Sequence, residues 1–337
     1  MDLKKTYIIA EAGVNHNGSY AKAKKLLIAA KDSGADAIKF QTFIPDEVVT
    51  KKLSLASYQK TSNTTKQKTM LSMIKKLHLN FHQQKKLYKL ANKKKIDFIS
   101  SAFDQKSLDF LCNDLKLNII KIPSGEITNY PYLKEISKRN RKVILSTGLS
   151  NLNEIKQALN VLSSNKLQRR NISILHCNTA YPTPLEDVNL KVLRKLKKIF
   201  NLPIGYSDHT LGIEVSLAAV SIGAKIIEKH FTLNKNFKGP DHKASLDVNE
   251  LKVMIKSIRN IEKSFGSDEK KLTKSESKNI RYVRKFIVAK KTIKKGDRFS
   301  TNNLTIKRSG GGISPMLWKK LLGKKSKFNF KKDEKIK

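Results

Sequence analysis

The sequence has little cysteine and no long uncharged apolar run. Cys112 and Cys177 are its only cysteines, too few for a disulfide framework and too far apart for a CxxC site. No charge-free apolar run approaches the roughly 18 residues of a membrane span. The first residues also lack the layout of a signal peptide. We therefore expect a cytoplasmic protein without a membrane partner.

Acidic residues are scarce as well: 28 Asp and Glu face 69 Lys and Arg, for a net charge of +41. Such an excess raises the alternative of a nucleic-acid-binding protein. Only 10 of the basic residues are Arg, however, and the lysines are spread along the whole chain. Nucleic-acid readers favour Arg, whose planar fork makes bidentate contacts. We expect a solvated Lys-rich surface without a nucleic-acid partner, whose field still favours an anionic substrate.

Hydrophobic residues make up 39% of the chain, enough for a packed core. Their distribution predicts eight short strands that are apolar throughout, as strands of a parallel sheet buried on both faces are. The predicted strands are Tyr7–Gly13, Ala37–Phe43, Asp97–Phe103, Ile119–Glu126, Val143–Gly148, Ile172–Asn178, Ile204–His209 and Ile226–Thr232.

Amphipathic stretches with helical spacing lie between these strands. They include Tyr20–Ser33, Phe81–Lys95, Gln105–Leu115, Asn151–Leu162, Asn189–Phe200 and Leu211–Gly223. Eight βα units in about 260 residues predict the α/β class and a (β/α)8 TIM barrel. The alternative, a doubly wound open sheet, favours a GxGxxG motif after its first strand, and Glu11–Gly18 lacks that spacing.

We expect three parts in the chain: a barrel domain over residues 1–265, a charged linker over 266–282 and a small β-rich domain over 283–337. Within the barrel domain, Ile44–Asn80 is too long for an ordinary βα loop. Loops of this length are often functional.

Polar side chains stand at the end of every predicted strand. In a TIM barrel these ends meet at one face, where the active site lies. The strand-end residues, all polar except Phe103, are Glu11; Lys39 and Gln41; Ser101 and Phe103; Lys121, Ser124 and Glu126; Ser146; Asn178, Thr179 and Tyr181; Ser207, Asp208 and His209; and Glu228, Lys229 and His230. The pattern predicts a densely functionalised pocket.

Two histidines in this set suggest a metal site. His209 and His230 end neighbouring strands, about 4.8 Å apart. Two imidazoles with oxygen groups nearby suit a divalent ion such as Mn²⁺ that keeps positions open for substrate and water. A hydrogen-bonded pair of core histidines is the alternative. His16 is a third candidate near the same face.

The lysines and serines suggest an anion site. Lys39 and Lys121 face inward, where an unpaired ammonium is costly, and Ser101, Ser124, Ser146 and Ser207 supply small hydroxyl donors. The set favours a multi-oxygen anion such as a phosphorylated carboxylic acid. Glu11 and Glu126 are then candidates for a base or for an acceptor of sugar hydroxyls, with ion pairs to the lysines as the alternative.

The same residues lie in motifs that resemble the N-acetylneuraminate (sialic acid) synthase family, including its legionaminic acid synthases. The motifs cover almost the whole chain: Ile8–Gly18, Ile38–Thr42, Lys121–Glu126 (KIPSGE), Leu145–Gly148, His176–Pro184, Gly205–Thr210, Ile227–Thr232 (IEKHFT), Gly239–Leu246 and Leu304–Pro315. The last one resembles the family's antifreeze-like SAF domain.

The resemblance implies a TIM barrel followed by a SAF domain, in a domain-swapped homodimer where each SAF domain covers the partner's site. It implies condensation of phosphoenolpyruvate with an N-acyl hexosamine aldehyde, with C–O cleavage, giving a nine-carbon nonulosonic acid and phosphate. The resemblance also implies a divalent metal cofactor, usually Mn²⁺. The acceptor is either N-acetylmannosamine or 2,4-diacetamido-2,4,6-trideoxymannose. The alternative enzyme is a related synthase acting on a sugar phosphate, although the sugar-site matches Glu126, Tyr181 and Asp241 are not basic.

The resemblance also implies roles by position. His209 and His230 match the metal ligands, and Glu11 is our preferred base for activating water. The matches to the phosphoenolpyruvate site are Lys39, Ser101, Lys121, Ser124, Ser146, Thr179 and Ser207. The matches around the sugar are Gln41, Phe103, Glu126, Tyr181 and Asp241, with Arg308 of the tail reaching the acceptor across the dimer. Asn63 in the long loop is a possible further sugar contact.

Overall fold

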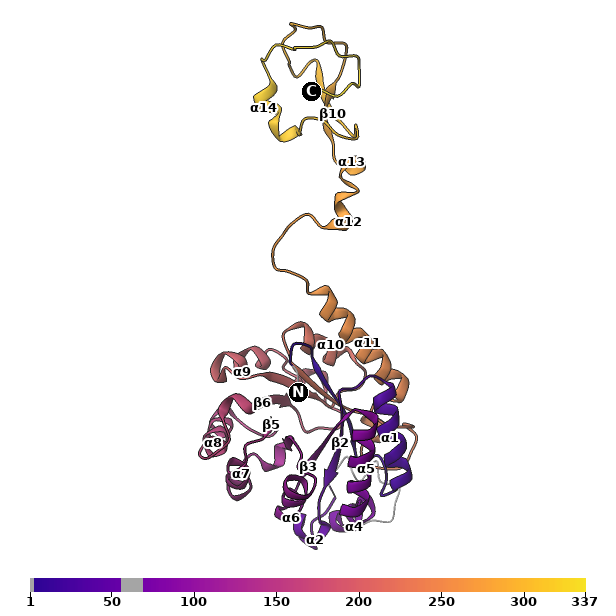
Figure 1. Ribbon diagram of the computed structural model, residues 1–337, viewed down its shortest axis with the longest axis vertical. Helices are drawn as coiled ribbons and strands as arrows, with labels where there is room; N and C mark the ends of the chain where they lie inside the picture. Colours follow the sequence, from indigo (N-terminus) through magenta and orange to yellow (C-terminus); the bar gives the residue numbers. More distant parts are fainter. Residues whose placement is uncertain (1–2, 56–68) are drawn as a thin grey trace. The chain divides into compact units, whose positions relative to one another are not determined.

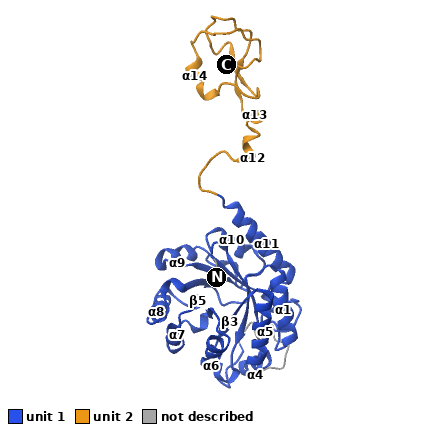
Figure 2. Cartoon of the chain, viewed as in Figure 1, with its two compact units in different colours: residues 1–266 blue, residues 267–337 orange. Residues whose placement is uncertain are grey.

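The computed structural model describes residues 3–55 and 69–337. The chain divides into two compact units, Met1–Gly266 and Ser267–Lys337, coloured blue and orange in Figure 2. Each unit is described by itself.

The first unit is a closed barrel of eight parallel strands in chain order, surrounded by helices (Figure 1). This confirms the predicted barrel. The strands are β1 (Tyr7–Gly13), β2 (Ala37–Thr42), β3 (Asp97–Ala102), β4 (Ile119–Ile122), β5 (Lys142–Ser146), β6 (Ile172–Cys177), β7 (Ile204–Asp208) and β8 (Ile226–His230).

The inside of the barrel has an apolar layer toward the amino ends of the strands. Eight buried side chains form it: Tyr7, Ile9, Ala37, Ile99, Ile119, Ile144, Leu175 and Ile226. Side chains alternate between the two faces of a strand, so the next inward position lies two residues further on. There the chain places Glu11 after Ile9 and Lys39 after Ala37. The apolar layer is thus the floor beneath a polar layer.

The helices pack their apolar faces on the outside of the strands, in one continuous core cluster. They are α1 (Tyr20–Asp32), α5 (Phe81–Lys94), α6 (Gln105–Asp109) with a π-helical turn (Phe110–Asp114), α7 (Tyr130–Ser137), α8 (Leu152–Leu162), α9 (Val192–Phe200), α10 (Glu214–Ser221) and α11 (Val248–Ser264). Helix α9 begins three residues later than expected, because Asn189 has a positive φ of 50° and cannot belong to a right-handed helix.

The long segment after β2 is not simply a loop. It contains α2 (Pro45–Val48) and α4 (Met70–Leu77). The expectation of a loop overlooked the spacing of Leu71, Met73 and Leu77, which α4 buries. A capping box between Thr69 and Ser72 begins this helix by satisfying backbone N–H groups that lack intrahelical partners.

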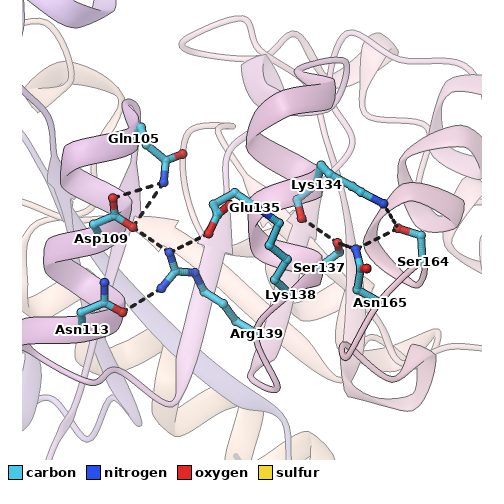
Figure 3. A network of polar contacts seen from close by, with 10 residues as sticks. All are labelled: Gln105, Asp109, Asn113, Lys134, Glu135, Ser137, Lys138, Arg139, Ser164 and Asn165. Atoms are coloured by element: carbon cyan, nitrogen blue, oxygen red, sulfur yellow. Dashed lines mark hydrogen bonds and ion pairs between the residues drawn. The ribbon is translucent and has the colours of Figure 1, made fainter.

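Polar contacts join neighbouring helices on the outside of the barrel (Figure 3). Arg139, just after α7, donates to Asp109 of α6 at 2.7 Å and to Asn113 at 2.9 Å. It also contacts Glu135 within its own turn at 3.1 Å. One guanidinium therefore ties the α6 region to α7, away from the strand interior.

The second unit contains α12 (Lys274–Ser277), α13 (Ile280–Val283), the antiparallel pair β9 (Phe286–Ala289) and β10 (Leu304–Lys307), and α14 (Trp318–Leu321). Its core is small and built on Ile287, Ala289, Ile293, Leu304 and Phe330. The first two helices fall in the segment expected as a linker, where their side chains are largely exposed. Across both units, no described helix is long and apolar enough to cross a membrane.

Candidate active site

A polar cavity of about 320 Å³ opens above the apolar floor of the barrel, at the carboxyl ends of the strands. Thirteen of the predicted site residues line it: Glu11, Lys39, Gln41, Ser101, Phe103, Lys121, Ser124, Ser146, Thr179, Tyr181, Ser207, His209 and His230. Strand pairing explains their convergence. Glu11 is in register with Lys39 on one side and with His230 on the other, and Ser101 is in register with Lys121.

Glu228 joins the two lysines of the cavity. One of its carboxylate oxygens lies 3.6 Å from the Lys39 ammonium, 3.7 Å from the Lys121 ammonium and 3.1 Å from the donating Ser207 hydroxyl. Lys39 also pairs with Glu11 at 3.0 Å. All four charged side chains are at least nine-tenths buried. Two ammoniums and two carboxyl groups therefore share one site with little water to screen them.

The two carboxyl groups differ in their affinity for protons. Burial raises the pKa of Glu11 to about 8, and the nearby Lys39 offsets this only in part. Burial also acts to raise the pKa of Glu228, but Lys121 and Lys39 outweigh it and leave the pKa below its usual value. Glu228 is thus the permanent anion, while Glu11 is suited to exchange a proton near neutral pH.

Serine hydroxyl groups lie next to the lysines in the wall of the cavity. Lys121 donates to the Ser146 hydroxyl at 2.6 Å, and the Ser124 hydroxyl accepts from the backbone N–H of Gly148 at 3.0 Å. A Cβ at Gly148 would lie 2.8 Å from Thr179 and 2.9 Å from Ser124. Glycine is therefore required where these two walls of the cavity approach each other.

His209 and His230 face each other with ring centroids 5.4 Å apart. Nδ1 of His209 hydrogen-bonds the backbone carbonyl of Asn178. A carbonyl only accepts, so Nδ1 carries the hydrogen and Nε2 keeps its lone pair. Burial lowers the pKa of His209 to about 4 and that of His230 well below its usual value, so both rings are neutral at physiological pH.

The two imidazoles of His209 and His230 fit a metal ion that takes most of its ligands from groups other than protein side chains. Nδ1 of His230 is buried and has no hydrogen-bond partner among the described residues, and such orphaned atoms are rare in folded proteins. In the described ranges, no three His, Cys, Asp or Glu residues gather in an arrangement that could hold a metal. Two histidine ligands would leave the remaining coordination positions of such an ion to other groups.

Tyr181 lines this side of the cavity, and Gly13 packs closely against two of the lining residues. The Tyr181 ring lies 4.1 Å from the His209 ring and 5.7 Å, edge on, from the His230 ring. Gly13 adopts a positive φ of 49°, and a Cβ there would lie 3.2 Å from Glu11 and 3.3 Å from His230. The backbone thus approaches the carboxyl group and the imidazole closely.

Three predicted residues lie elsewhere. Glu126 is half-buried in a 3₁₀ turn, where it accepts from Asn129 at 2.6 Å, and it lines neither this cavity nor the second one described below. Asp241 lines a second cavity next to the first. Arg308 is exposed in the second unit, just after β10. Asn63 lies outside the described residues. His16, the third metal candidate, is buried and accepts from the backbone N–H of Gly18 at 3.0 Å.

The strand-end pattern includes Glu228, but it does not predict the contact of this residue with both lysines. Its alternation with His230 on one strand indicates only that it faces the pocket. Two other strand-end residues that the pattern predicts in the pocket, Asp208 and Lys229, instead form an ion pair outside its lining. Lys229 lies 3.0 Å from Asp208 and donates to the backbone carbonyl of Thr210 at 2.6 Å, and both charged side chains are fully buried. Since each is the chain neighbour of a histidine, this ion pair joins the two strand ends that carry His209 and His230.

The chain matches known families along nearly its whole length. Residues 26–270 match the NeuB family and residues 284–337 match the SAF domain. It is 54% identical to the N,N'-diacetyllegionaminic acid synthase of Campylobacter jejuni over 99% of both chains. It is 44% identical to the N,N'-diacetyllegionaminic acid synthase of Legionella pneumophila, over 96% of this chain and 91% of that one.

A solved structure shows the same fold. The N-acetylneuraminic acid (sialic acid) synthetase of Leptospira borgpetersenii, in complex with citrate, superposes with a TM-score of 0.72 and 32% identity, covering 83% of this chain and 92% of that one. Fold and site together define a barrel synthase with a C-terminal SAF domain. The chain belongs to the NeuB family and is an enzyme of the NeuB type, as its sequence motifs predict.

Proposed function

We propose that the enzyme condenses phosphoenolpyruvate with an N-acyl hexosamine aldehyde to form a nine-carbon nonulosonic acid and phosphate. The observation that carries this proposal is the polar cavity. Two buried ammoniums, several hydroxyls and two neutral imidazoles line one space of about 320 Å³. The names of relatives, two of them N,N'-diacetyllegionaminic acid synthases, support the product class.

Phosphoenolpyruvate carries a phosphate and a carboxylate, which need cations and hydrogen-bond donors. Lys39 and Lys121 supply the charge, while Ser101, Ser124, Ser146, Thr179 and Ser207 line the same space with hydroxyls. The hydroxyl of Ser101 is buried without a partner among the described residues. A phosphate or carboxylate oxygen would satisfy it.

The aldehyde is placed at the histidine side of the cavity. His209 and His230 would hold a divalent metal, most suitably Mn²⁺, which when bound polarises the aldehyde oxygen. Gln41, Phe103 and Tyr181 line the path from the histidines toward the second cavity. The remaining sugar chain extends along them, and Asp241 serves as a hydroxyl acceptor further out.

The reaction joins C3 of phosphoenolpyruvate to the aldehyde carbon while water adds to C2, and the C2–O bond to phosphate then breaks. Glu11 takes the proton of the attacking water, which its raised pKa favours. The aldehyde oxygen gains a proton to become a hydroxyl. When the C2–O bond breaks, the C2 hydroxyl becomes the keto group and its proton leaves with the phosphate, so both protons of the water are accounted for. Glu228 stays ionised and holds both lysines in place.

The test is phosphate release from phosphoenolpyruvate with Mn²⁺, comparing N-acetylmannosamine, 2,4-diacetamido-2,4,6-trideoxymannose and a sugar phosphate. Release with either N-acyl sugar, together with a nine-carbon 2-keto acid in the product, is expected. No release with any N-acyl sugar would overturn the proposal.

We further propose a domain-swapped homodimer in which Arg308 of one copy reaches the acceptor bound in the other barrel. In support, Arg308 is an exposed cation beside the glycine-rich segment after β10. Arg308→Ala is expected to raise the KM for the acceptor while leaving the KM for phosphoenolpyruvate unchanged.

Co-expression of Arg308→Ala and His230→Ala chains tests the swap directly. In a swapped mixed dimer, the intact barrel of the first chain receives the intact arginine of the second. With the acceptor well below the raised KM of Arg308→Ala, each variant alone turns over little, whereas about a quarter of the sites in the mixture have both the histidine and the arginine. Mixed dimers with no recovered activity would exclude the swap.

A further inference from the structure

A buried thiol lies in the wall of the polar cavity and takes no part in the reaction proposed above. Cys177 is the last residue of β6, is 5% exposed and lines the cavity beside Ser124 and Thr179. Its Sγ lies 3.1 Å from the hydroxyl oxygen of Ser124. The other cysteine of the chain, Cys112, is also buried but lines neither cavity. The contact with Ser124, and not burial alone, therefore distinguishes Cys177.

The contact between Cys177 and Ser124 spans three neighbouring strands of the barrel. Ser124 follows β4, Gly148 follows β5 and Cys177 ends β6. A Cβ at Gly148 would lie 2.9 Å from the Ser124 hydroxyl and 3.0 Å from Sγ of Cys177. The glycine thus leaves the space in which a side chain from β6 reaches across β5 to a side chain after β4.

The hydrogen bonds of Ser124 decide what its hydroxyl can offer to a ligand. A serine oxygen accepts two hydrogen bonds and donates one. The backbone N–H of Gly148 fills one acceptor position at 3.0 Å. The contact with Cys177 has two possible directions: the thiol donates to the hydroxyl oxygen, or the hydroxyl donates to the sulfur. Only the first direction leaves the O–H group of Ser124 available to a ligand in the cavity.

A bound anion favours the direction in which the thiol donates. Burial raises the pKa of the Cys177 thiol, so the sulfur carries its proton at neutral pH. Sulfur is a weak acceptor, whereas a hydrogen bond from a hydroxyl to an anionic oxygen is charge-assisted and roughly twice as strong as a neutral one. The Ser124 proton therefore goes to the anion, and the thiol proton fills the second acceptor position of the Ser124 oxygen.

A second hydroxyl of the same cavity also points to an anionic ligand there. Ser101 is 1% exposed, and its hydroxyl has no partner among the described residues. We propose that Cys177 is a positioning residue for phosphoenolpyruvate: by donating its thiol proton to Ser124, it directs the Ser124 hydroxyl toward an oxygen of the bound anion. This inference rests on the proposed condensation at the polar cavity. Because Cys177 acts through Ser124, its effect falls on the binding of phosphoenolpyruvate and not on kcat.

The first experiment measures the Kd of phosphoenolpyruvate by calorimetry, and kcat with both substrates saturating, in the presence of Mn²⁺. Cys177→Ala is expected to raise the Kd about five- to tenfold with kcat unchanged, because Ser124 loses the donor that orients its hydroxyl. Cys177→Ser keeps a donor and should stay within about twofold of wild type. The matched control is Cys112→Ala, which removes a buried thiol outside both cavities and should leave the Kd unchanged.

The sign of the change in Kd separates the two directions of the hydrogen bond. If the Ser124 hydroxyl donated to the sulfur, Cys177→Ala would free it, and the Kd would fall or stay the same; either result would overturn the inference while leaving the proposed function intact. If the wild-type enzyme did not bind phosphoenolpyruvate, the proposed function itself would fail. Cys177→Val, which also lacks a donor, takes the place of Cys177→Ala if that variant does not fold.

A double-mutant cycle tests whether Cys177 acts through Ser124. Ser124→Ala removes the hydroxyl that the thiol positions, and it should raise the Kd of phosphoenolpyruvate by itself. In the Ser124→Ala background, Cys177→Ala is expected to change the Kd by less than about twofold, because the two residues share one interaction. Fully additive effects of the two substitutions would show that Cys177 acts on the site by packing alone, which would contradict the proposed positioning role.

Discussion

The two layers inside the barrel lie only two residues apart along each strand, yet they have opposite effects on the stability of the fold. The lower layer, with Ile9, Ile144 and Ile226, is apolar and buried. The upper layer, with Glu11, Ser146 and Glu228, lines the polar cavity. The lower layer stabilises the barrel by burying apolar surface, whereas the upper layer keeps charges in a low-dielectric space at a cost in stability. Substitutions in the two layers should therefore separate stability from catalysis.

The largest effect is expected in the upper layer. His230→Ala should reduce turnover by more than about a hundredfold, since it removes one of two proposed metal ligands, while the melting temperature of the metal-free protein changes little. Activity and bound Mn²⁺ are measured together, with His82→Ala on the exposed face of α5 as control. Near-normal metal content and rate in His230→Ala would refute the ligand assignment.

The second-largest effect is expected for the ion pair between Lys229 and Asp208, at the ends of β8 and β7. Lys229→Met leaves Asp208 as an uncompensated buried charge and should cost about 3–5 kcal/mol of unfolding free energy. Adding Asp208→Asn to Lys229→Met should recover part of this loss, because the charge is gone. Chemical denaturation measures the unfolding free energy of both variants, and Lys225→Met, at an exposed position, is the control. If Lys229→Met and Lys225→Met were equally stable, the pair would have no structural role.

The sharpest comparison uses one residue from each layer on β5. Ile144→Ala should cost about 2–5 kcal/mol of stability and leave the KM for phosphoenolpyruvate unchanged. Ser146→Ala should cost about 1 kcal/mol but raise that KM about tenfold, because Lys121 and the substrate lose a shared hydroxyl. Equal effects of the two variants on the KM would show that the layers are not functionally distinct.

The smallest effect concerns Asp241. Burial raises its pKa to about 6, with Lys39 opposing the shift. The folded state therefore binds this proton more tightly than the unfolded state, so its contribution to stability is present below about pH 4 and is lost as the pH rises through 6. Asp241→Asn should thus melt higher than wild type at pH 8 but not at pH 4, while using the acceptor less well. If the melting temperatures of wild type and Asp241→Asn changed in parallel between pH 4 and pH 8, the raised pKa of Asp241 would be excluded.

The alternation of apolar and polar residues made the barrel and most of its site predictable. Eight apolar runs ending in polar side chains imply parallel strands whose carboxyl ends meet. Glu11, Lys39 and His230 accordingly line one cavity. The helix α4 was not predicted, because its eight residues lie in a segment otherwise rich in Lys, Ser and Thr. Glu126 was placed near the site by its motif, but its side chain turns instead toward Asn129.

The order and period of the apolar residues, read from the sequence alone, determined the barrel and its polar face, because strand alternation is a local property of the backbone. The sequence motifs, not this periodicity, indicated the membership of the NeuB family. Only the tertiary structure decided that Glu228 bridges Lys39 and Lys121 and that α4 lines a second, largely apolar cavity beside His230. Those arrangements depend on register and packing between segments far apart in the chain, and no local pattern encodes them.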